Sequence, residues 1–253
     1  MFNQIYMIKI MKKIIKDFLE KYKFVRGDIN LNSRAGALHK CWGHIFSNHL
    51  FGDYVEFGVY HGDSFLESIK QFKQFKKWLE NQKNSSETWR VQVAINSPLN
   101  QAVYFHGLDT FEGMPKNDEK NFIFHEKSYL SSHEKVLGRI RKVNFKNFFL
   151  YKGKFNESEK EILENFKDRK ISIANIDCDI YSSTVDSFKI IENFLQIGSI
   201  ILLDDYNAFN ADNLKGQRKA LHEYKKKTKW IIEPFFSYMY SGQSFIVVGN
   251  KDL

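Results

Sequence analysis

The chain has 253 residues, a length that suits one large domain with a sizeable buried core. Its 43% of apolar residues exclude an intrinsically disordered protein, and its two cysteines are too few for a disulfide scaffold, which favours a reducing, cytoplasmic compartment. The net charge of +8 indicates an anionic partner. Because the lysines are scattered and no arginine-rich tract is present, we expect a small-molecule partner, anionic or nucleotide-linked, and no nucleic acid.

The N-terminal residues 1–24 contain an apolar stretch that is broken by Lys9, Lys12 and Lys13. This excludes a signal peptide, and no run approaches the roughly 18 apolar residues of a membrane span, so stable membrane insertion is not expected. The pattern predicts a basic amphipathic helix, for which attachment to a membrane surface is one alternative. We expect residues 1–50 to form a helical lid or a dimer contact, and hence a homo-oligomer interface, for a domain at 51–253.

Strand-like and helix-like patterns alternate along the rest of the chain. Strands are predicted at 53–59, 102–109, 147–153, 171–177 and 199–205, helices at 62–80, 131–142, 158–167, 184–196 and 216–227, and two last strands at 230–236 and 243–250. Strands separated by such helices predict an α/β fold with a mostly parallel seven-stranded sheet, helices on both faces and an antiparallel hairpin at one edge. An unusually long connection at about 81–101 is predicted to be an insertion on the rim, with a small strand of its own at 90–95.

Two turns after predicted strands have the composition of a ligand-binding site. In "VEFGVYHGDS" (55–64), Gly58 and Gly62 flank a turn into a helix, where glycine lets the backbone approach a ligand and the helix start offers free amides. Glu56 could accept hydrogen bonds from an amino-bearing ligand, although an ordinary strand-to-helix turn is the alternative. In "HGLDTFEGMP" (106–115), Asp109 ends a strand, as does the acidic residue that binds ribose in nucleoside-binding α/β folds. A turn cap is the simpler alternative there.

Acidic residues follow two further strands that we expect to be neighbours. Asp177 stands in "NIDCDIYSST", and Asp204 and Asp205 stand in "LLDDY". Three converging carboxylates repel one another without a cation, and an oxygen-only ligand set suits Mg²⁺, Mn²⁺ or Ca²⁺. The alternative is that Asp205 caps a turn and Asp204 forms an ion pair with Arg218 or a lysine. Asp179 should point to the other side of an extended chain, as a helix cap, a supporting group or a base.

Taken together, "VEFGVYHGDS", "GLDTFEGMP", "IDCDIYSSTVDSF", "GSIILLDDY" and "GQRKALHEY" resemble the macrocin O-methyltransferase family over roughly residues 53–250. The resemblance implies a Rossmann-like class I methyltransferase fold and an S-adenosylmethionine-dependent, Mg²⁺-dependent enzyme that methylates sugar hydroxyls. Residues 1–50 are similar to the family only loosely, as its helical N-terminal lid. The chain departs from the family at 81–101, where members have a shorter connection.

The resemblance also implies roles for individual residues. S-adenosylmethionine would be bound by Glu56, Gly58, Tyr60, Gly62, Ser64, Asp109, Thr110, Phe111, Gly153, Phe155 and Asp177. Of these, Glu56 and Gly58 would line its methionine part, Asp109 would hold its ribose, and Gly153 and Phe155 would lie near its adenine. Mg²⁺ (or Mn²⁺) would be held by Asp177, Asp204 and Asp205.

The resemblance thus implies an O-methyltransferase that acts on a sugar, a nucleotide-linked sugar or a surface-glycan precursor. The sulfonium methyl is already activated, so the enzyme must orient the acceptor and lower the pKa of its hydroxyl, which a divalent cation does. A carboxylate then accepts the proton; Asp177 is the first candidate and Asp179 the alternative. Other functions remain open: methylation of a non-sugar acceptor such as a catechol or a phosphorylated group, nucleic-acid binding on the same fold, and cofactor-dependent regulation without catalysis.

Overall fold

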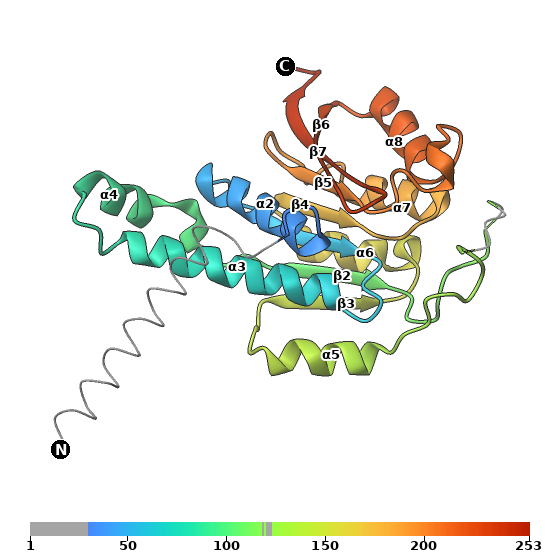
Figure 1. Cartoon of the computed structure of the whole chain (residues 1–253), viewed down its shortest axis with the longest axis horizontal. Helices are drawn as coiled ribbons and strands as arrows, with labels where there is room; N and C mark the ends of the chain where they lie inside the picture. The colour runs from blue at the N-terminus through green and yellow to red at the C-terminus, as the bar shows by residue number, and fades with distance from the viewer. Residues whose placement is uncertain (1–29, 118, 120–122) are drawn as a thin grey trace.

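The computed structural model describes residues 30–117, 119 and 123–253 (Figure 1). The helix predicted within residues 1–24 lies outside the described residues. The strands are β1 (Asp53–Phe57), β2 (Phe105–Asp109), β3 (Phe148–Lys152), β4 (Ile171–Ile176), β5 (Ile200–Leu203), β6 (Trp230–Tyr238) and β7 (Gly242–Asn250). The helices are α2 (Arg34–Ser47), α3 (Asp63–Gln82), α4 (Thr88–Asn96), α5 (His133–Lys142), α6 (Phe155–Phe166), α7 (Tyr181–Ile191) and α8 (Gly216–Lys227), with short 3₁₀ turns at Pro98–Asn100 and Phe209–Ala211.

The seven strands form one sheet in the order β3-β2-β1-β4-β5-β7-β6. The first five strands are parallel, β7 pairs antiparallel with β5, and β6 pairs antiparallel with β7 at the edge. The predicted mostly parallel sheet with an antiparallel edge hairpin is therefore confirmed. No helix within the described ranges is both long and apolar enough to cross a bilayer.

Both faces of the sheet are covered by helices (Figure 1). Successive residues of β1 point to opposite layers, because side chains alternate along a strand. Tyr54 packs into the cluster with Trp42 of α2 and Phe65 of α3, whereas Phe57 packs into the cluster with Phe188 of α7 and other residues of α6 and α8. This double coverage explains why the parallel strands read as continuous apolar runs.

Helix α2 is held firmly against the sheet and α3. Ser33 caps its start, with Oγ accepting a hydrogen bond from the Gly36 amide at 3.0 Å. Trp42 is fully buried, stacks on Phe105 with ring centroids 5.6 Å apart, and donates its indole N–H to Ser68 Oγ at 3.0 Å. The residues at the start of α2 therefore have a fixed position relative to the sheet.

The strand predicted at 90–95 is wrong, because this segment lies within α4. Val93 and Ile95 are exposed, and Ala94 is the residue of α4 that is buried. Figure 1 places α4 beside the far end of α3, away from the strands, and α4 packs on α3. A segment without an adjacent sheet edge satisfies its backbone hydrogen bonds within a helix, so the apolar alternation did not produce a strand.

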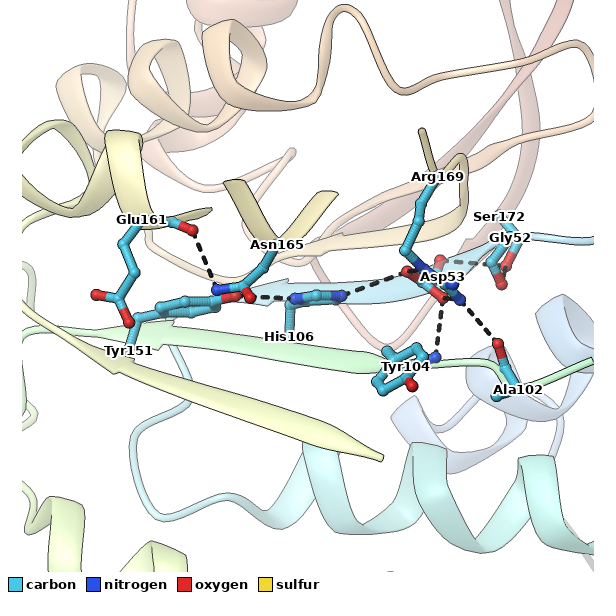
Figure 2. A network of polar contacts seen from close by, with 10 residues as sticks. All are labelled: Gly52, Asp53, Ala102, Tyr104, His106, Tyr151, Glu161, Asn165, Arg169 and Ser172. Carbon is cyan, nitrogen blue, oxygen red and sulfur yellow. Dashed lines mark hydrogen bonds and ion pairs between the residues drawn. The ribbon is translucent and has the colours of Figure 1, made fainter. Parts of the chain in front are cut away.

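A buried ion-pair network ties together the N-terminal ends of the central strands (Figure 2). Asp53 is fully buried at the start of β1, and its Oδ1 accepts hydrogen bonds from Arg169 Nη2 at 2.6 Å and from the Tyr104 amide at 2.8 Å. Its Oδ2 lies 3.4 Å from His106 Nε2, and His106 Nδ1 lies 3.1 Å from the Tyr151 hydroxyl. Burial alone would raise the pKa of Asp53, but the hydrogen bonds from Arg169, His106 and Tyr104 lower it below its ordinary value of 3.8.

We expect Asp53→Asn to lower the free energy of unfolding by about 3 kcal/mol, because it leaves Arg169 without its carboxylate partner in a partly buried site. The pKa of Asp53 is lower in the folded state, so its stabilising contribution is present above pH 3.8 and is lost as the pH falls further. The difference between wild type and variant should thus be constant from pH 7 to about pH 5 and disappear at more acidic pH. Urea unfolding across this range measures it.

The matched control is Asp63→Asn, which removes an exposed aspartate from its ion pair with Arg139. Exposed pairs contribute little, so this variant should lose no more than about 1 kcal/mol. Equal losses in the two variants would show that the Asp53 network does not stabilise the fold.

Candidate active site

A cavity of about 680 Å³ opens at the C-terminal edge of the parallel strands. It lies where β1 is flanked by β2 on one side and β4 on the other, which is the point of an open α/β sheet where ligands bind. Residues after β1 (Gly58, Tyr60, Ser64), β2 (Asp109, Thr110), β4 (Asp177, Asp179) and β5 (Asp204, Asp205) line it. The two predicted turns and the predicted acidic residues thus share one cavity.

The turn after β1 requires glycine at position 58. Gly58 has a φ of 88°, and a Cβ there would lie 1.8 Å from the backbone oxygen of Asp177. The loops that follow β1 and β4 therefore pass in close contact, which brings the two halves of the site together. Tyr60, two residues later, has a φ of 50°, an uncommon conformation for a residue with a side chain.

Asp109 organises the rim of the cavity. Its Oδ2 accepts a hydrogen bond from the Tyr60 amide at 2.6 Å, and its Oδ1 accepts one from the Phe111 amide at 2.6 Å. Burial raises the pKa of Asp109 above its ordinary value even though these hydrogen bonds act in the opposite direction. Asp109 therefore holds the turns after β1 and β2 in place while it lines the cavity.

Glu56 lies below the cavity and does not line it. It is fully buried and accepts hydrogen bonds from the Tyr54 hydroxyl, from Ser64 Oγ at 2.7 Å and from Asn175 Nδ2 at 3.1 Å. Burial raises its pKa to about 6. Glu56 is therefore in a position to support Ser64, which does line the cavity, and to act on a ligand through it.

The other residues predicted to bind the cofactor divide into two groups. Gly58, Tyr60, Ser64, Asp109, Thr110, Phe155 and Asp177 line the cavity, whereas Gly62, Phe111, Gly153 and Glu56 do not. Of the second group, Glu56 lies within β1, Gly62 directly precedes α3 with a φ of 81°, Phe111 follows β2 and Gly153 follows β3. Binding of the cofactor by either group stays a prediction.

Three carboxylates meet in the cavity. Asp177, Asp179 and Asp205 each place one oxygen within 4.8 Å of the others. The expectation that Asp179 points to the other side of the chain is wrong, because Asp179 has a φ of 60° and the chain is not extended there. We call Asp177, Asp179, Asp204 and Asp205 the acid cluster; Asp204 is its fourth member and shares a cationic partner with Asp177.

That partner is Arg34, the first residue of α2. Its Nη1 lies 3.1 Å from Asp177 Oδ2, and its Nη2 donates to Asp204 Oδ2. The sequence predicted Arg218 or a lysine as the alternative partner of Asp204. Arg218 instead lies over the Tyr206 ring at 4.4 Å. Part of the positive charge that the acid cluster requires is thus supplied by the protein itself.

Arg34 was missed by the sequence analysis, because it lies 170 residues from Asp204 and outside every recognised motif. One signal was available. Ser33 is a favourable helix cap, and an arginine directly after it is placed where acidic residues are preferred. An arginine in that position needs a nearby negative charge.

The acid cluster retains more negative charge than Arg34 offsets. Burial and the charge of Asp204 raise the pKa of Asp177 well above its ordinary value, and burial and the charge of Asp179 do the same for Asp205. Burial and the charges of Asp177 and Asp204 raise the pKa of Asp179 to about 7. Among the described residues, nothing donates a hydrogen bond to the buried Oδ2 of Asp205. A set of partly buried carboxylate oxygens, of which Asp205 Oδ2 has no partner among the described residues, fits a hard divalent cation such as Mg²⁺ or Mn²⁺.

The loop after β2 adds an aromatic wall that the sequence analysis also missed. Tyr129 lines the cavity, has a φ of 61° and packs edge-on against Tyr60 with ring centroids 5.7 Å apart. Burial and the negative charges of Asp179, Asp205 and Asp177 raise its pKa, so its hydroxyl lies within the field of the acid cluster. Its segment has no regular periodicity, and only the fold brings it to this position.

Solved structures with the same fold include several O-methyltransferases. The O-methyltransferase NovP is 18% identical, with a TM-score of 0.58 over 85% of this chain and 80% of NovP. The calicheamicin methyltransferase CalS11 is 14% identical, with a TM-score of 0.57 over 89% of each chain. An O-methyltransferase from Bacillus cereus, solved in complex with SAH, is 11% identical, with a TM-score of 0.51 over 85% of this chain and 81% of its own. No curated protein matches the sequence.

A family model adds information that these distant structural likenesses cannot give. The model of the macrocin-O-methyltransferase (TylF) family matches residues 90–241, more than half of the chain. The matched segment contains Asp109 and all four residues of the acid cluster, and it covers four of the five motifs on which the resemblance was based; the motif at 55–64 lies outside it. The chain therefore belongs to the macrocin-O-methyltransferase family and is an O-methyltransferase with a Rossmann-like class I fold.

Proposed function

We propose that the protein transfers the methyl group of S-adenosylmethionine to a hydroxyl of a sugar, a nucleotide-linked sugar or a glycan precursor, with the help of a divalent cation. The observation that carries this proposal is that one cavity is lined by Gly58 in the turn after β1, by Asp109 at the end of β2 and by the acid cluster. A cofactor on one side of this cavity and an acceptor beside the acid cluster would be adjacent. The family and the described activity of CalS11, a TDP-rhamnose 3'-O-methyltransferase, favour a sugar acceptor.

The cofactor would lie along the ends of β1 and β2. Gly58 and Asp109 both line the cavity, and Asp109 stands at the end of β2, where nucleoside-binding α/β folds have the acidic residue that binds ribose. Phe155, at the start of α6, lines the cavity and offers an apolar contact for adenine. The Bacillus cereus relative was solved with SAH, the product form of this cofactor.

The cation would be held by the sequence-predicted set Asp177, Asp204 and Asp205. Asp177 and Asp205 belong to the three carboxylates that converge, and Asp204 is next to them with one oxygen on Arg34. When bound, the cation lowers the pKa of the acceptor hydroxyl and fixes its position. Two lysines, Lys116 and Lys154, also line the cavity, which supports an anionic acceptor such as a sugar on a diphosphate.

Asp179 is the residue that we assign as the base. S-adenosylmethionine, when bound, would supply the methyl group: the acceptor oxygen would bond to the methyl carbon as the carbon–sulfur bond breaks, and sulfur would keep the electron pair. The hydroxyl proton passes to the Asp179 carboxylate, whose pKa of about 7 suits proton transfer at neutral pH. Asp177, the first candidate from the sequence, is engaged by Arg34 and is better placed to hold the cation.

Removing the cation or one of its ligands should stop the reaction and spare cofactor binding. We expect excess EDTA to abolish methyl transfer, and Asp205→Asn to lower the rate by about 100-fold or more, since a charged ligand is lost. Product mass after incubation with S-adenosylmethionine, Mg²⁺ and a panel of nucleotide sugars gives the rate, and calorimetry gives the SAH affinity. The exposed Asp168→Asn is the control; full activity in EDTA would contradict the metal role.

Asp179→Asn should show whether Asp179 acts as a general base or as a metal ligand. We expect it to lower turnover by about 10²–10⁴-fold while Mn²⁺ binding is retained, because a base contributes to proton transfer only. The wild-type kcat/KM should rise with pH as Asp179 loses its proton, and this rise should be absent in the variant. Loss of Mn²⁺ binding in the variant would instead place Asp179 among the ligands.

Asp109→Ala should weaken cofactor binding and leave metal binding unchanged. We expect SAH affinity to fall by about 10–100-fold, because hydrogen bonds to a charged group contribute roughly 1.5–3 kcal/mol. Mn²⁺ binding should be unaffected, since Asp109 belongs to a different strand end from the acid cluster. Isothermal calorimetry measures both, and unchanged SAH affinity in a folded variant would show that the ribose does not bind there.

A further inference from the structure

Arg34 connects α2 to the acid cluster. Its guanidinium spans the ends of two neighbouring strands, because Asp177 follows β4 and Asp204 follows β5. It contacts Oδ2 of both carboxylates, and its Nε has no hydrogen-bond partner among the described residues. The two carboxylates are therefore the groups that fix its orientation.

Arg34 occupies a position in α2 where a positively charged side chain is unfavourable. It is the first residue of a 14-residue helix, where the helix dipole disfavours a cation. The buried face of α2, including Trp42, holds the helix in place, so Arg34 cannot move away from this position without its helix. Residues that break such a preference are found where a site needs them, and here the acid cluster offsets the cost.

We propose that Arg34 is a positioning residue of the acid cluster, which holds Asp177 and Asp204 side by side so that one oxygen of each remains available to a divalent cation. This inference rests on the metal role in the proposed function. An arginine suits the task because its planar fork can donate to two carboxylates at once in a fixed geometry. A lysine in the same place would supply the charge without the fork.

Removal of Arg34 should change metal affinity in opposite directions, depending on whether Arg34 orients the carboxylates or contributes only its charge. If Arg34 contributed only its charge, its removal would leave the acid cluster more negative and would strengthen cation binding. If Arg34 orients the carboxylates, its removal weakens cation binding, as the loss of groups that orient metal ligands does by about 10–100-fold. The sign of the change therefore tests the inference.

The experiment compares the full chain with Arg34→Gln and Arg34→Lys. Mn²⁺ affinity is measured from the electron paramagnetic resonance signal of free Mn²⁺, without cofactor or acceptor, so that the readout does not depend on turnover. We expect both variants to bind Mn²⁺ about 10–100-fold more weakly than wild type. Arg34→Lys keeps the charge next to the carboxylates, and circular dichroism establishes that each variant is folded.

Arg90→Gln is the matched control, since it removes an arginine from an exposed ion pair with Glu87 on α4 and should leave Mn²⁺ affinity unchanged. Tighter Mn²⁺ binding by Arg34→Gln, or wild-type affinity in Arg34→Lys, would overturn the inference and leave the proposed metal site intact. A wild-type protein that does not bind Mn²⁺ would overturn both.

Discussion

The repulsion among four aspartates at the ends of β4 and β5 is the constraint on which the site depends. Asp177 and Asp205 have pKa values raised well above the ordinary range by burial and by neighbouring carboxylates, and Arg34 offsets only part of that charge. Apolar residues, or carboxylates that are each paired with a cation, would make the fold more stable than four neighbouring aspartates do. The acid cluster therefore indicates a ligand that brings positive charge.

The sheet topology creates this concentration of charge. Because β1 lies between β2 and β4, the turns after these strands open into the same cavity, and Gly58 allows two of them to touch. The same arrangement places Asp109 on the other side of the cavity from β5. A methyl donor and a polar acceptor can thus be bound next to each other by loops that each belong to a rigid strand.

The sequence predicted most of this arrangement, because apolar periodicity and strand-end carboxylates are local signals. The sequence-based predictions were wrong or incomplete where the structure depends on contacts between distant parts of the chain or on an unusual backbone conformation. Asp179 lines the cavity because of a positive φ, and residues 90–95 are helical because none of the strands in the described part of the chain pairs with them. Arg34 reaches Asp204 from 170 residues away, a contact that only the packing of α2 defines.

The two ends of the central strands use buried carboxylates in opposite ways. Asp53 at the start of β1 has Arg169, His106 and a backbone amide as partners, and its pKa is lowered. Asp177 at the end of β4 has Arg34 but also Asp204 and Asp205 nearby, and its pKa is raised. The first arrangement stabilises the fold without further help. The second leaves negative charge that Arg34 does not offset, and such under-compensated charge in a cavity is characteristic of functional sites.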